Sequence, residues 1–220
     1  MFDFAAARQM MVDGQVRTSD VTDQRIIAAM LDLPRERFVP ESNAFLAYLD
    51  LDVAVTSGTP ARRLLKPMVL AKLIQAAEVG PQDRVLDVGC ATGYSTALLA
   101  RLAHGVVALE EDATLTRHAR ENLAAFGATN AEVVTGVLPG GWPEGAPYDV
   151  ILINGAAEVV PERLLRQLAE GGRLVGVVGR APASKAVRYL AAGGQASALP
   201  VFDAAGPALP GFAEPPAFVF

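Results

Sequence analysis

The stretch from residue 84 to residue 110 constrains the fold more than any other part of the chain. Residues 84–88 form a short apolar run that is typical of a strand buried in a parallel sheet. A turn of small residues, 89–93, is followed by a helical run and then by a second strand, 105–109, that ends in the acid Glu110. Glycines let the backbone approach a ligand closely, and an acid can accept both hydroxyls of a ribose. This order of elements therefore predicts a unit that binds a nucleoside.

The spacing within the turn distinguishes two classes of cofactor. A dinucleotide site has the pattern G-x-G-x-x-G and places a pyrophosphate on the helix N-terminus. Here the glycines are spaced Gly89-x-Ala91-x-Gly93, and Asp87 stands two residues before the first of them. A carboxylate beside a pyrophosphate is unfavourable, which argues against an NAD-dependent oxidoreductase. The same carboxylate suits the sulfonium and ammonium groups of S-adenosylmethionine.

The stretch resembles motif I of the class I methyltransferases. That resemblance implies an S-adenosylmethionine site, and the candidate ligands in this part of the chain are Asp87, Gly89, Cys90, Ala91, Gly93, Glu110 and Glu111. It also implies an α/β fold of the class I methyltransferase (Rossmann-like) type, a mostly parallel sheet with helices on both faces. We expect an N-terminal helical extension in addition.

Composition excludes several other classes of protein. The chain has 220 residues, 51% of them hydrophobic, and a formal net charge of -5, which argues against a nucleic-acid-binding surface. One cysteine, Cys90, fits a reducing compartment and is expected to be a small buried side chain. We find no signal peptide and no apolar stretch long enough to cross a membrane, so we expect a cytoplasmic protein. His104 and His118 have no neighbours at ligand spacing, so no metal is proposed.

Helices are expected in the first forty residues, one over residues 1–15 and a second that Thr22 caps. The rest of the chain continues the alternation of strands and helices. The expected elements are a helix at 112–126, strands at 131–135 and 149–153, a helix that Pro161 opens and that runs to 168, a strand at 173–178, an edge strand at 185–190, a loop at 203–216 and a last strand at 217–220. We expect residues 1–220 to form a single methyltransferase domain. Residues 1–66 would be its helical cap and substrate-side loop, and residues 67–220 its cofactor-binding core.

A more specific resemblance extends from about residue 11 to residue 179, in order along the chain. The sequence is similar to protein-L-isoaspartate O-methyltransferases in the runs 11–17, 21–25, 34–40, 47–50, 85–89, 92–94, 141–144, 146–149 and 167–175. The resemblance implies methyl transfer from S-adenosylmethionine to the α-carboxylate of isoaspartyl residues in damaged proteins. The ester then goes on to a succinimide, which reopens in part to normal aspartate.

Two departures from the family pattern affect the implied site. The family's catalytic serine falls at Leu65, which can donate no hydrogen bond. The loop before it is longer than the family pattern, and there we propose Ser57 and Thr56 as sources of a hydroxyl. Arg63 is our candidate for holding the substrate carboxylate by a fork of two hydrogen bonds, and Arg62 and Lys66 lie in the same loop.

The second departure follows the strand at 131–135. The family has Gly-Asp there, and this chain has Gly136 and Val137, so one polar contact to the adenine is lost. After the strand at 149–153 comes Asn154, at the sheet edge where ligands bind in open α/β sheets. We expect Gly136, Val137 and Asn154 to line the cofactor site.

These departures leave two other functions open. One is a methyltransferase with a different acceptor, suggested by the altered loop. The other is a non-catalytic module that keeps the fold, and with it the cofactor or a partner, suggested by Leu65 and Val137.

Overall fold

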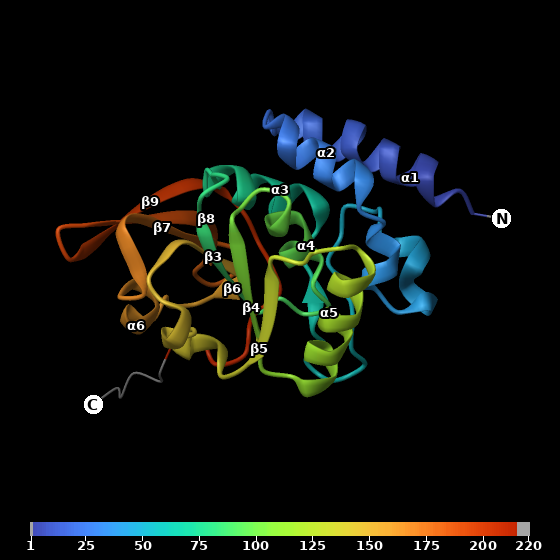
Figure 1. Cartoon of the computed structure of the whole chain (residues 1–220). Helices are drawn as coiled ribbons and strands as arrows, with labels where there is room; N and C mark the ends of the chain where they lie inside the picture. The colour runs from blue at the N-terminus through green and yellow to red at the C-terminus, as the bar shows by residue number, and fades with distance from the viewer. Residues whose placement is uncertain (1, 215–220) are drawn as a thin grey trace.

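The computed structural model describes residues 2–214, and its centre is a seven-stranded sheet (Figure 1). The strand order is β5-β4-β3-β6-β7-β8-β9. The first five strands in this order are parallel, and β8 and β9 are antiparallel to their neighbours. The strands are β3 (Arg84–Val88), β4 (Gly105–Glu110), β5 (Ala131–Thr135), β6 (Tyr148–Ala157), β7 (Leu168–Val178), β8 (Lys185–Ala192) and β9 (Gln195–Asp203). The predicted mostly parallel α/β sheet is confirmed.

The order of the strands places a crevice at the carboxyl ends of β3 and β6. From β3 the chain proceeds outwards through β4 and β5, and it then crosses back to β6 on the other side of β3. The connection after β3 runs to one side and the strand on its other side is β6, so a gap opens between them. Ligands of open α/β sheets bind at such a switch point. Residues that follow β3, β4 and β6 therefore face one another there.

Helices cover both faces of the sheet. One face packs on α3 (Pro67–Ala76), α4 (Tyr94–Ala100) and α5 (Ala113–Ala125), whose apolar residues belong to one large buried cluster. The other face is covered by the single-turn helix α6 (Glu162–Leu165) and by short 3-10 turns at Leu138–Gly140 and Pro143–Gly145. Because the second face has so little helix, side chains of the C-terminal segment, Leu209 and Phe212, complete its core.

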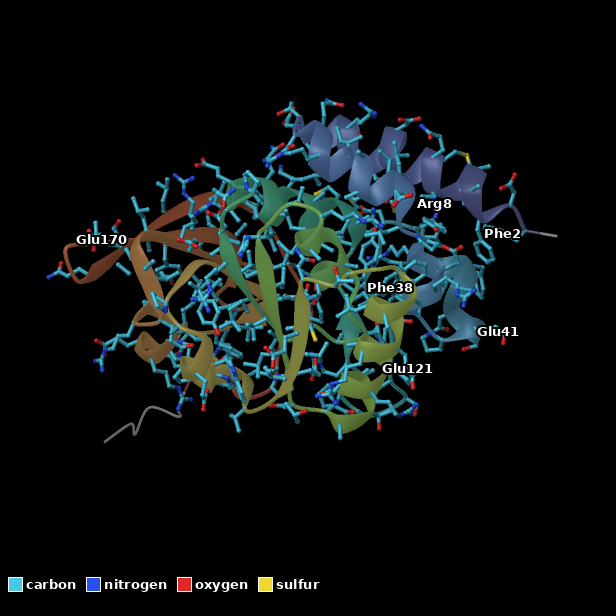
Figure 2. The ribbon with its side chains drawn as sticks, viewed as in Figure 1. Phe2, Arg8, Phe38, Glu41, Glu121 and Glu170 are labelled. Carbon is cyan, nitrogen blue, oxygen red and sulfur yellow. The ribbon has the colours of Figure 1, made fainter. Side chains whose placement is uncertain are left out.

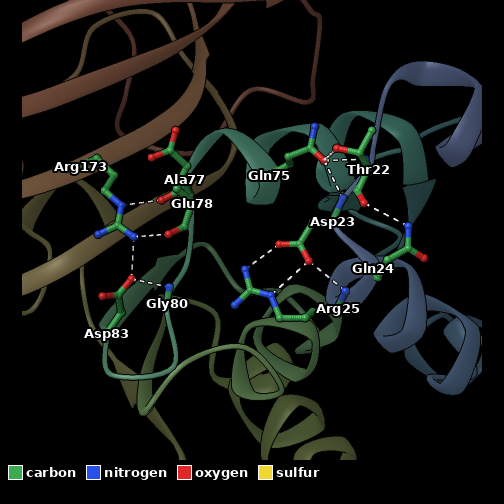
Figure 3. Close-up of polar contacts among 10 residues, drawn as sticks. All are labelled: Thr22, Asp23, Gln24, Arg25, Gln75, Ala77, Glu78, Gly80, Asp83 and Arg173. Atoms are coloured by element: carbon green, nitrogen blue, oxygen red, sulfur yellow. Dashed lines mark hydrogen bonds and ion pairs between the residues drawn. The ribbon is translucent and has the colours of Figure 1, made fainter.

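The N-terminal residues form a helical layer on the α3–α4 side of the molecule (Figure 1). It contains α1 (Phe4–Met11), a π-turn at Val12–Val16, α2 (Gln24–Asp32) and 3-10 turns at Arg17–Ser19, Arg35–Phe38 and Glu41–Leu46. The residue that caps α2 is Asp23, whose carboxylate accepts from the backbone N–H of Arg25, so the expected cap at Thr22 is wrong by one position. The backbone N–H groups of Thr22 and Asp23 instead donate to Gln75 of α3 (Figure 3).

Buried side chains join this layer to the core. Phe38 extends from the N-terminal layer toward the end of α5 (Figure 2), with its ring 5.2 Å from that of Phe126 and 5.3 Å from that of Tyr94. Arg35 is fully buried, donates to the carbonyls of Ala47 and Leu65, and lies 4.7 Å from the centre of the Tyr94 ring. On the sheet side, Arg173 of β7 binds the loop after α3 through backbone carbonyls and Asp83 (Figure 3). The cap and the sheet thus share one continuous core.

The C-terminal half differs from the expectation in one helix and in its last strands. The helix expected at 161–168 is a single turn, because β7 begins at Leu168 and the Gln167 side chain binds the loop around Trp142. The strand at 185–190 is not an edge strand, since β9 pairs with its outer side. Residues 204–214 form no strand, as expected, while the strand expected at 217–220 lies outside the described residues. Within residues 2–214, none of the helices has the length and apolarity needed to cross a membrane.

Candidate active site

The turn between β3 and α4 is the tightest part of the crevice. Gly89, Ala91 and Gly93 all have positive φ, at 80°, 52° and 92°. The backbone N–H of Gly89 donates to the Leu109 carbonyl on β4 at 2.8 Å, which holds the turn against the next strand. A Cβ on Gly93 would lie 3.4 Å from Ala119 of α5, so a side chain there would crowd the helix as well as strain the backbone. Cys90 is buried within the turn, as expected, and burial raises the pKa of its thiol well above the usual value.

Asp87 lies at the base of this turn and has one free oxygen. Its Oδ2 accepts from the hydroxyls of Ser95 and Thr96 in the first turn of α4, each at 2.6 Å. Its Oδ1 is buried and has no hydrogen-bond partner in the described chain. Burial raises the pKa of Asp87 to about 6, although the two hydroxyls favour the ionised form. A buried acceptor without a partner is costly, so this oxygen is a candidate ligand for a cation.

Glu110 at the end of β4 is fully buried and accepts from five groups. Backbone N–H groups of Ala91, Glu111 and Asp112 donate to it at 2.9, 3.0 and 3.2 Å. Arg62, which is distant in the sequence, donates to both carboxylate oxygens, at 2.6 and 2.9 Å. The side chain of Arg62 is 11% exposed and that of Glu110 is 0% exposed, so this is a buried ion pair. We call Asp87, the turn at 89–93 and Glu110 the crevice floor.

Two side chains from outside the floor lie directly on Gly89. A Cβ built on Gly89 would be 3.1 Å from Leu209 and 3.4 Å from an Nη of Arg62. Leu209 is held there because its N–H donates to the Ala156 carbonyl while the Pro207 carbonyl accepts from the Ala156 N–H. We call the two segments that carry these side chains, 55–62 and 204–212, the cover of the crevice. Neither Leu209 nor its segment was expected at the site, since nothing in its composition distinguishes it from an ordinary loop.

Asn154 closes the crevice on the β6 side. It lies inside β6, which continues to Ala157 past an irregularity in its pairing with β7, and not after the strand as expected. Its Nδ2 donates to the Gly89 carbonyl at 3.2 Å and to the Ser95 hydroxyl at 2.8 Å. Its Oδ1, like Oδ1 of Asp87, is buried without a partner. The sequence therefore predicted the sheet edge at which Asn154 lies, but it did not predict that β6 continues past this residue.

The far side of the crevice follows β5. The N–H of Gly136 donates to the Glu110 carbonyl, and a Cβ on Gly136 would be 3.4 Å from the ring of Trp142. Val137, expected to line the cofactor site, is 67% exposed. Glu111 is also exposed, so of the two acids Glu110 and Glu111 only Glu110 belongs to the buried floor.

The loop from residue 55 to residue 62 lines an open cavity of about 780 Å³ beside α5. Thr56 and Ser57 both line it, but the Thr56 hydroxyl accepts from the Arg62 N–H at 2.9 Å. Arg63 is exposed, donates to the Asp52 carbonyl and does not line this cavity. The structure therefore places Arg63 outside the crevice and its neighbour Arg62 inside it. Leu65 is buried in the core.

The groups of the floor suit an adenosyl sulfonium. The unpartnered oxygens of Asp87 and Asn154 are acceptors suited to a cation, and Glu110 is a buried carboxylate whose two oxygens pair with the Arg62 guanidinium in this structure. Leu209 and Arg62 both lie against Gly89 at the edge of this floor. In the described part of the chain, no three His, Cys, Asp or Glu side chains are grouped so that they could hold a metal.

Comparison with known proteins identifies the family. The family model for protein-L-isoaspartate(D-aspartate) O-methyltransferase (PCMT) matches residues 6–196. A protein-L-isoaspartate O-methyltransferase of Methanoculleus marisnigri is 37% identical over 194 residues, 88% of this chain and 87% of that protein. A second such enzyme, from Pelobacter propionicus, is 40% identical over 172 residues, 78% of this chain and 75% of its own length.

Two solved structures described as protein-L-isoaspartate O-methyltransferases have a similar fold. One protein-L-isoaspartate O-methyltransferase superposes with a TM-score of 0.79 at 25% identity, over 93% of this chain and 66% of that one. A putative enzyme of this kind from Plasmodium falciparum, in complex with S-adenosyl-L-homocysteine, gives a TM-score of 0.77 at 20% identity over 95% of this chain and 99% of that one. The family model spans most of the chain, and the relatives align over most of their own length. The chain therefore belongs to the protein-L-isoaspartate O-methyltransferase (PCMT) family.

Proposed function

We propose that this protein transfers a methyl group from S-adenosylmethionine to the free carboxylate of isoaspartyl residues in proteins. Membership of the family supports the reaction, and one observation within the chain carries the assignment of the site. Glu110, Asp87 and the left-handed turn between them form a single buried floor, with one unpartnered acceptor oxygen in it, on Asp87, and one beside it, on Asn154. When bound, the cofactor supplies an electrophilic methyl group on a sulfonium.

Residues of the floor and residues beside it each have a role in this proposal. Glu110 accepts the ribose hydroxyls, and the turn at 89–93, with Cys90 in it, brings the backbone close to the sugar. The free oxygens of Asp87 and Asn154 face the cationic end of the methionine portion. Backbone groups of Gly136 and Val137 contact the adenine edge, with Glu111 near the rim of the site.

The acceptor carboxylate needs no general base, because it is ionised at neutral pH. The chain has to hold the carboxylate in line with the sulfonium and exclude water, which by orientation alone contributes about 7–11 kcal/mol in favourable systems. Loss of the family's serine at Leu65 therefore removes an orienting contact but not the reaction. Hydroxyls of Ser57 and Thr56, at the cavity beside the crevice, are available to the substrate backbone.

Labelled methyl transfer tests this function directly. The protein is incubated with methyl-labelled S-adenosylmethionine and an isoaspartyl peptide, with the aspartyl peptide of the same sequence as the control. We expect label in the isoaspartyl peptide alone, released as methanol under mildly alkaline conditions, as an ester requires. Calorimetry with S-adenosylhomocysteine is run in parallel. Cofactor binding without ester formation would point to a different acceptor, and absence of binding would contradict the cofactor site.

The broader assignments extend this proposal. Ester formation on isoaspartate leads through a succinimide to partial recovery of aspartate, so the proposed role is protein repair. Damaged proteins are its proposed partners, since they carry the isoaspartyl residues. Nucleic acid is not a proposed partner, because the net charge of -5 disfavours its binding. We also propose a cytoplasmic location and a single domain in which residues 1–66 form the substrate side.

A further inference from the structure

The ion pair between Arg62 and Glu110 competes with the proposed ribose site. Oε1 of Glu110 accepts from Arg62 and from the N–H groups of Glu111 and Asp112, and Oε2 accepts from Arg62 and Ala91. A carboxylate has about four lone-pair sites. With five donors present, no site remains for a ribose diol. The three backbone donors are fixed in the turn (Ala91) and in the residues directly after Glu110 (Glu111 and Asp112), so Arg62 is the group that has to leave.

Arg62 is carried by a part of the chain that can release it. Strands β1 (Val53–Ala54) and β2 (Arg63–Leu64) are each two residues long. In the loop between them, the N–H of Val55 donates to the Arg62 carbonyl, and the N–H of Arg62 donates to the Thr56 hydroxyl. Residues 57–60 at its tip are exposed. Moving this loop therefore breaks few contacts apart from the ion pair.

The other side of the Arg62 side chain faces an open cavity. This cavity, of about 780 Å³, is lined among the described residues by one arginine and no lysine, and that arginine is Arg62. Hydroxyl-bearing side chains surround it: Ser42, Thr56, Ser57, Thr59 and Thr114. A guanidinium that leaves Glu110 thus has space beside it, and a planar two-pronged donor matches a carboxylate.

We propose that Arg62 alternates between two carboxylates. Before the cofactor binds it pairs with Glu110, and once ribose hydroxyls occupy Glu110 it pairs with the carboxylate of the isoaspartyl substrate. This inference rests on the proposed function, because it takes Glu110 as the ribose acceptor. It makes Arg62 the residue that selects an acidic acceptor, and it fixes the order of binding as cofactor first.

Ligand titration separates Arg62 from the rest of the site. The only tryptophan of the chain, Trp142, packs against Gly136, so its emission accompanies calorimetry as a second readout. We expect Arg62→Ala to bind S-adenosylhomocysteine about tenfold more tightly than the wild type, since binding no longer breaks the ion pair. Arg62→Gln, which keeps a hydrogen-bond donor but no charge, should give an intermediate gain. Arg166→Ala, which removes an exposed arginine paired with Glu162, is the matched control and should bind as the wild type does.

A ligand without the diol makes the test specific. The gain in Arg62→Ala should disappear for 2′,3′-dideoxy S-adenosylhomocysteine, because that ligand does not compete for Glu110. An equal gain for both ligands, or unchanged or weaker binding of S-adenosylhomocysteine, would overturn the exchange. Melting temperatures of the ligand-free variants show whether each has folded, and Arg62→Gln carries the comparison if Arg62→Ala has not.

Steady-state kinetics test the second half of the exchange. We expect Arg62→Ala to raise the KM for an isoaspartyl peptide at least tenfold with a smaller change in kcat, and Arg62→Lys to recover part of the loss. Product inhibition in the wild type should show that cofactor binds first. An unchanged peptide KM would overturn the substrate role. No cofactor binding in either the wild type or Arg62→Ala would overturn the proposed site itself, whereas equal binding in both would overturn the exchange alone.

Discussion

The floor and the cover of the crevice are built in different ways. The floor comes from one continuous strand–turn–helix–strand unit, and its residues from Asp87 to Gly93 are buried with Glu110. The cover comes from two segments that are far apart in the sequence, 55–62 and 204–212, and these contain almost no regular structure. Both contribute side chains to the same point, Gly89. The floor is therefore fixed by backbone pairing, while the cover is held by a few side chains and can move without disturbing it.

Glu110→Gln should have the largest effect, because Glu110 belongs to the floor and also holds the cover. We expect the affinity for S-adenosylhomocysteine to fall about 100-fold, or about 3 kcal/mol, as the charged acceptor is lost. The variant also leaves Arg62 buried without its counter-charge, so the free energy of unfolding should fall by about 3–5 kcal/mol. Calorimetry and urea denaturation measure the two effects, with the exposed Glu121→Gln as control. Affinity within threefold of the wild type would show that Glu110 is not the ribose acceptor.

Asp87 makes cofactor affinity depend on pH. Its pKa is raised to about 6 by burial, so it is ionised above that pH and neutral below it. If the ionised form attracts the cationic end of the cofactor, affinity should fall as the pH drops below 6, approaching tenfold per unit. Asp87→Asn should bind more weakly at pH 8 and show no such dependence. A wild-type affinity that stays constant from pH 5 to pH 8 would contradict this role.

The same carboxyl affects stability with the opposite sign. The unfolded chain releases the Asp87 proton near pH 3.8, whereas the folded chain keeps it until about pH 6. The folded state therefore binds more protons in this window, and its stability falls as the pH rises through it, by roughly 3 kcal/mol from this group. Asp87→Asn should lose this slope. Denaturation curves of both proteins across the window measure the difference, and parallel pH profiles would contradict the prediction.

Gly155→Ala should disturb the cover and leave the floor intact. A Cβ there would lie 2.6 Å from Leu209 and 2.9 Å from the Pro207 carbonyl, so segment 204–212 has to shift. We expect a loss of about 1–3 kcal/mol in the free energy of unfolding, as for other overpacked sites. Affinity for S-adenosylhomocysteine should stay within threefold of the wild type or improve. Gly14→Ala, where a Cβ meets nothing within 4 Å, is the control; a loss of affinity in Gly155→Ala alone would show that floor and cover are not separable.

Arg63→Ala should have the smallest effect. Its side chain is exposed and makes one hydrogen bond, to the Asp52 carbonyl, so its removal should cost less than about 1 kcal/mol. Cofactor affinity and turnover should both stay within about twofold of the wild type. A large loss of turnover would restore Arg63 as the residue that holds the substrate carboxylate and would weaken the case for Arg62.

The fold was predictable where local signals agree. Strand β3 (Arg84–Val88) and strand β5 (Ala131–Thr135) begin and end where the sequence placed them, and the helix at 112–126 begins at its Asp112 cap. Turn residues and apolar runs coincide there, so few alternatives exist. The prediction of a helix from Pro161 to residue 168 was wrong because tertiary contacts end it early. Gln167 accepts a hydrogen bond from the Trp142 N–H, and Leu168 pairs with β6. Strand β9 was missed because its polar and apolar residues are nearly all exposed and show no burial pattern.

The geometry of the floor was predictable from the sequence, and that of the cover was not. Asp87, the glycine turn and Glu110 belong to one continuous strand–turn–helix–strand unit, and their spacing alone brings them to the carboxyl ends of β3 and β4. Arg62 and Arg63 are neighbours of identical type, and successive side chains of an extended backbone point to opposite sides. Which of them faces Glu110 depends on how the short β1–β2 hairpin docks against the core.

The sequence by itself determined the strand–turn–helix unit, its buried acids and the family to which the chain belongs, because each depends on residues close together along the chain. Only the tertiary structure decided what lies on that unit. Contacts between residues 48 positions apart, as between Arg62 and Glu110, depend on the free energy of the whole packed core and leave no local pattern. The contact of Leu209 with Gly89 is another example. The second face of the sheet has little helix, and Leu209 therefore completes its core.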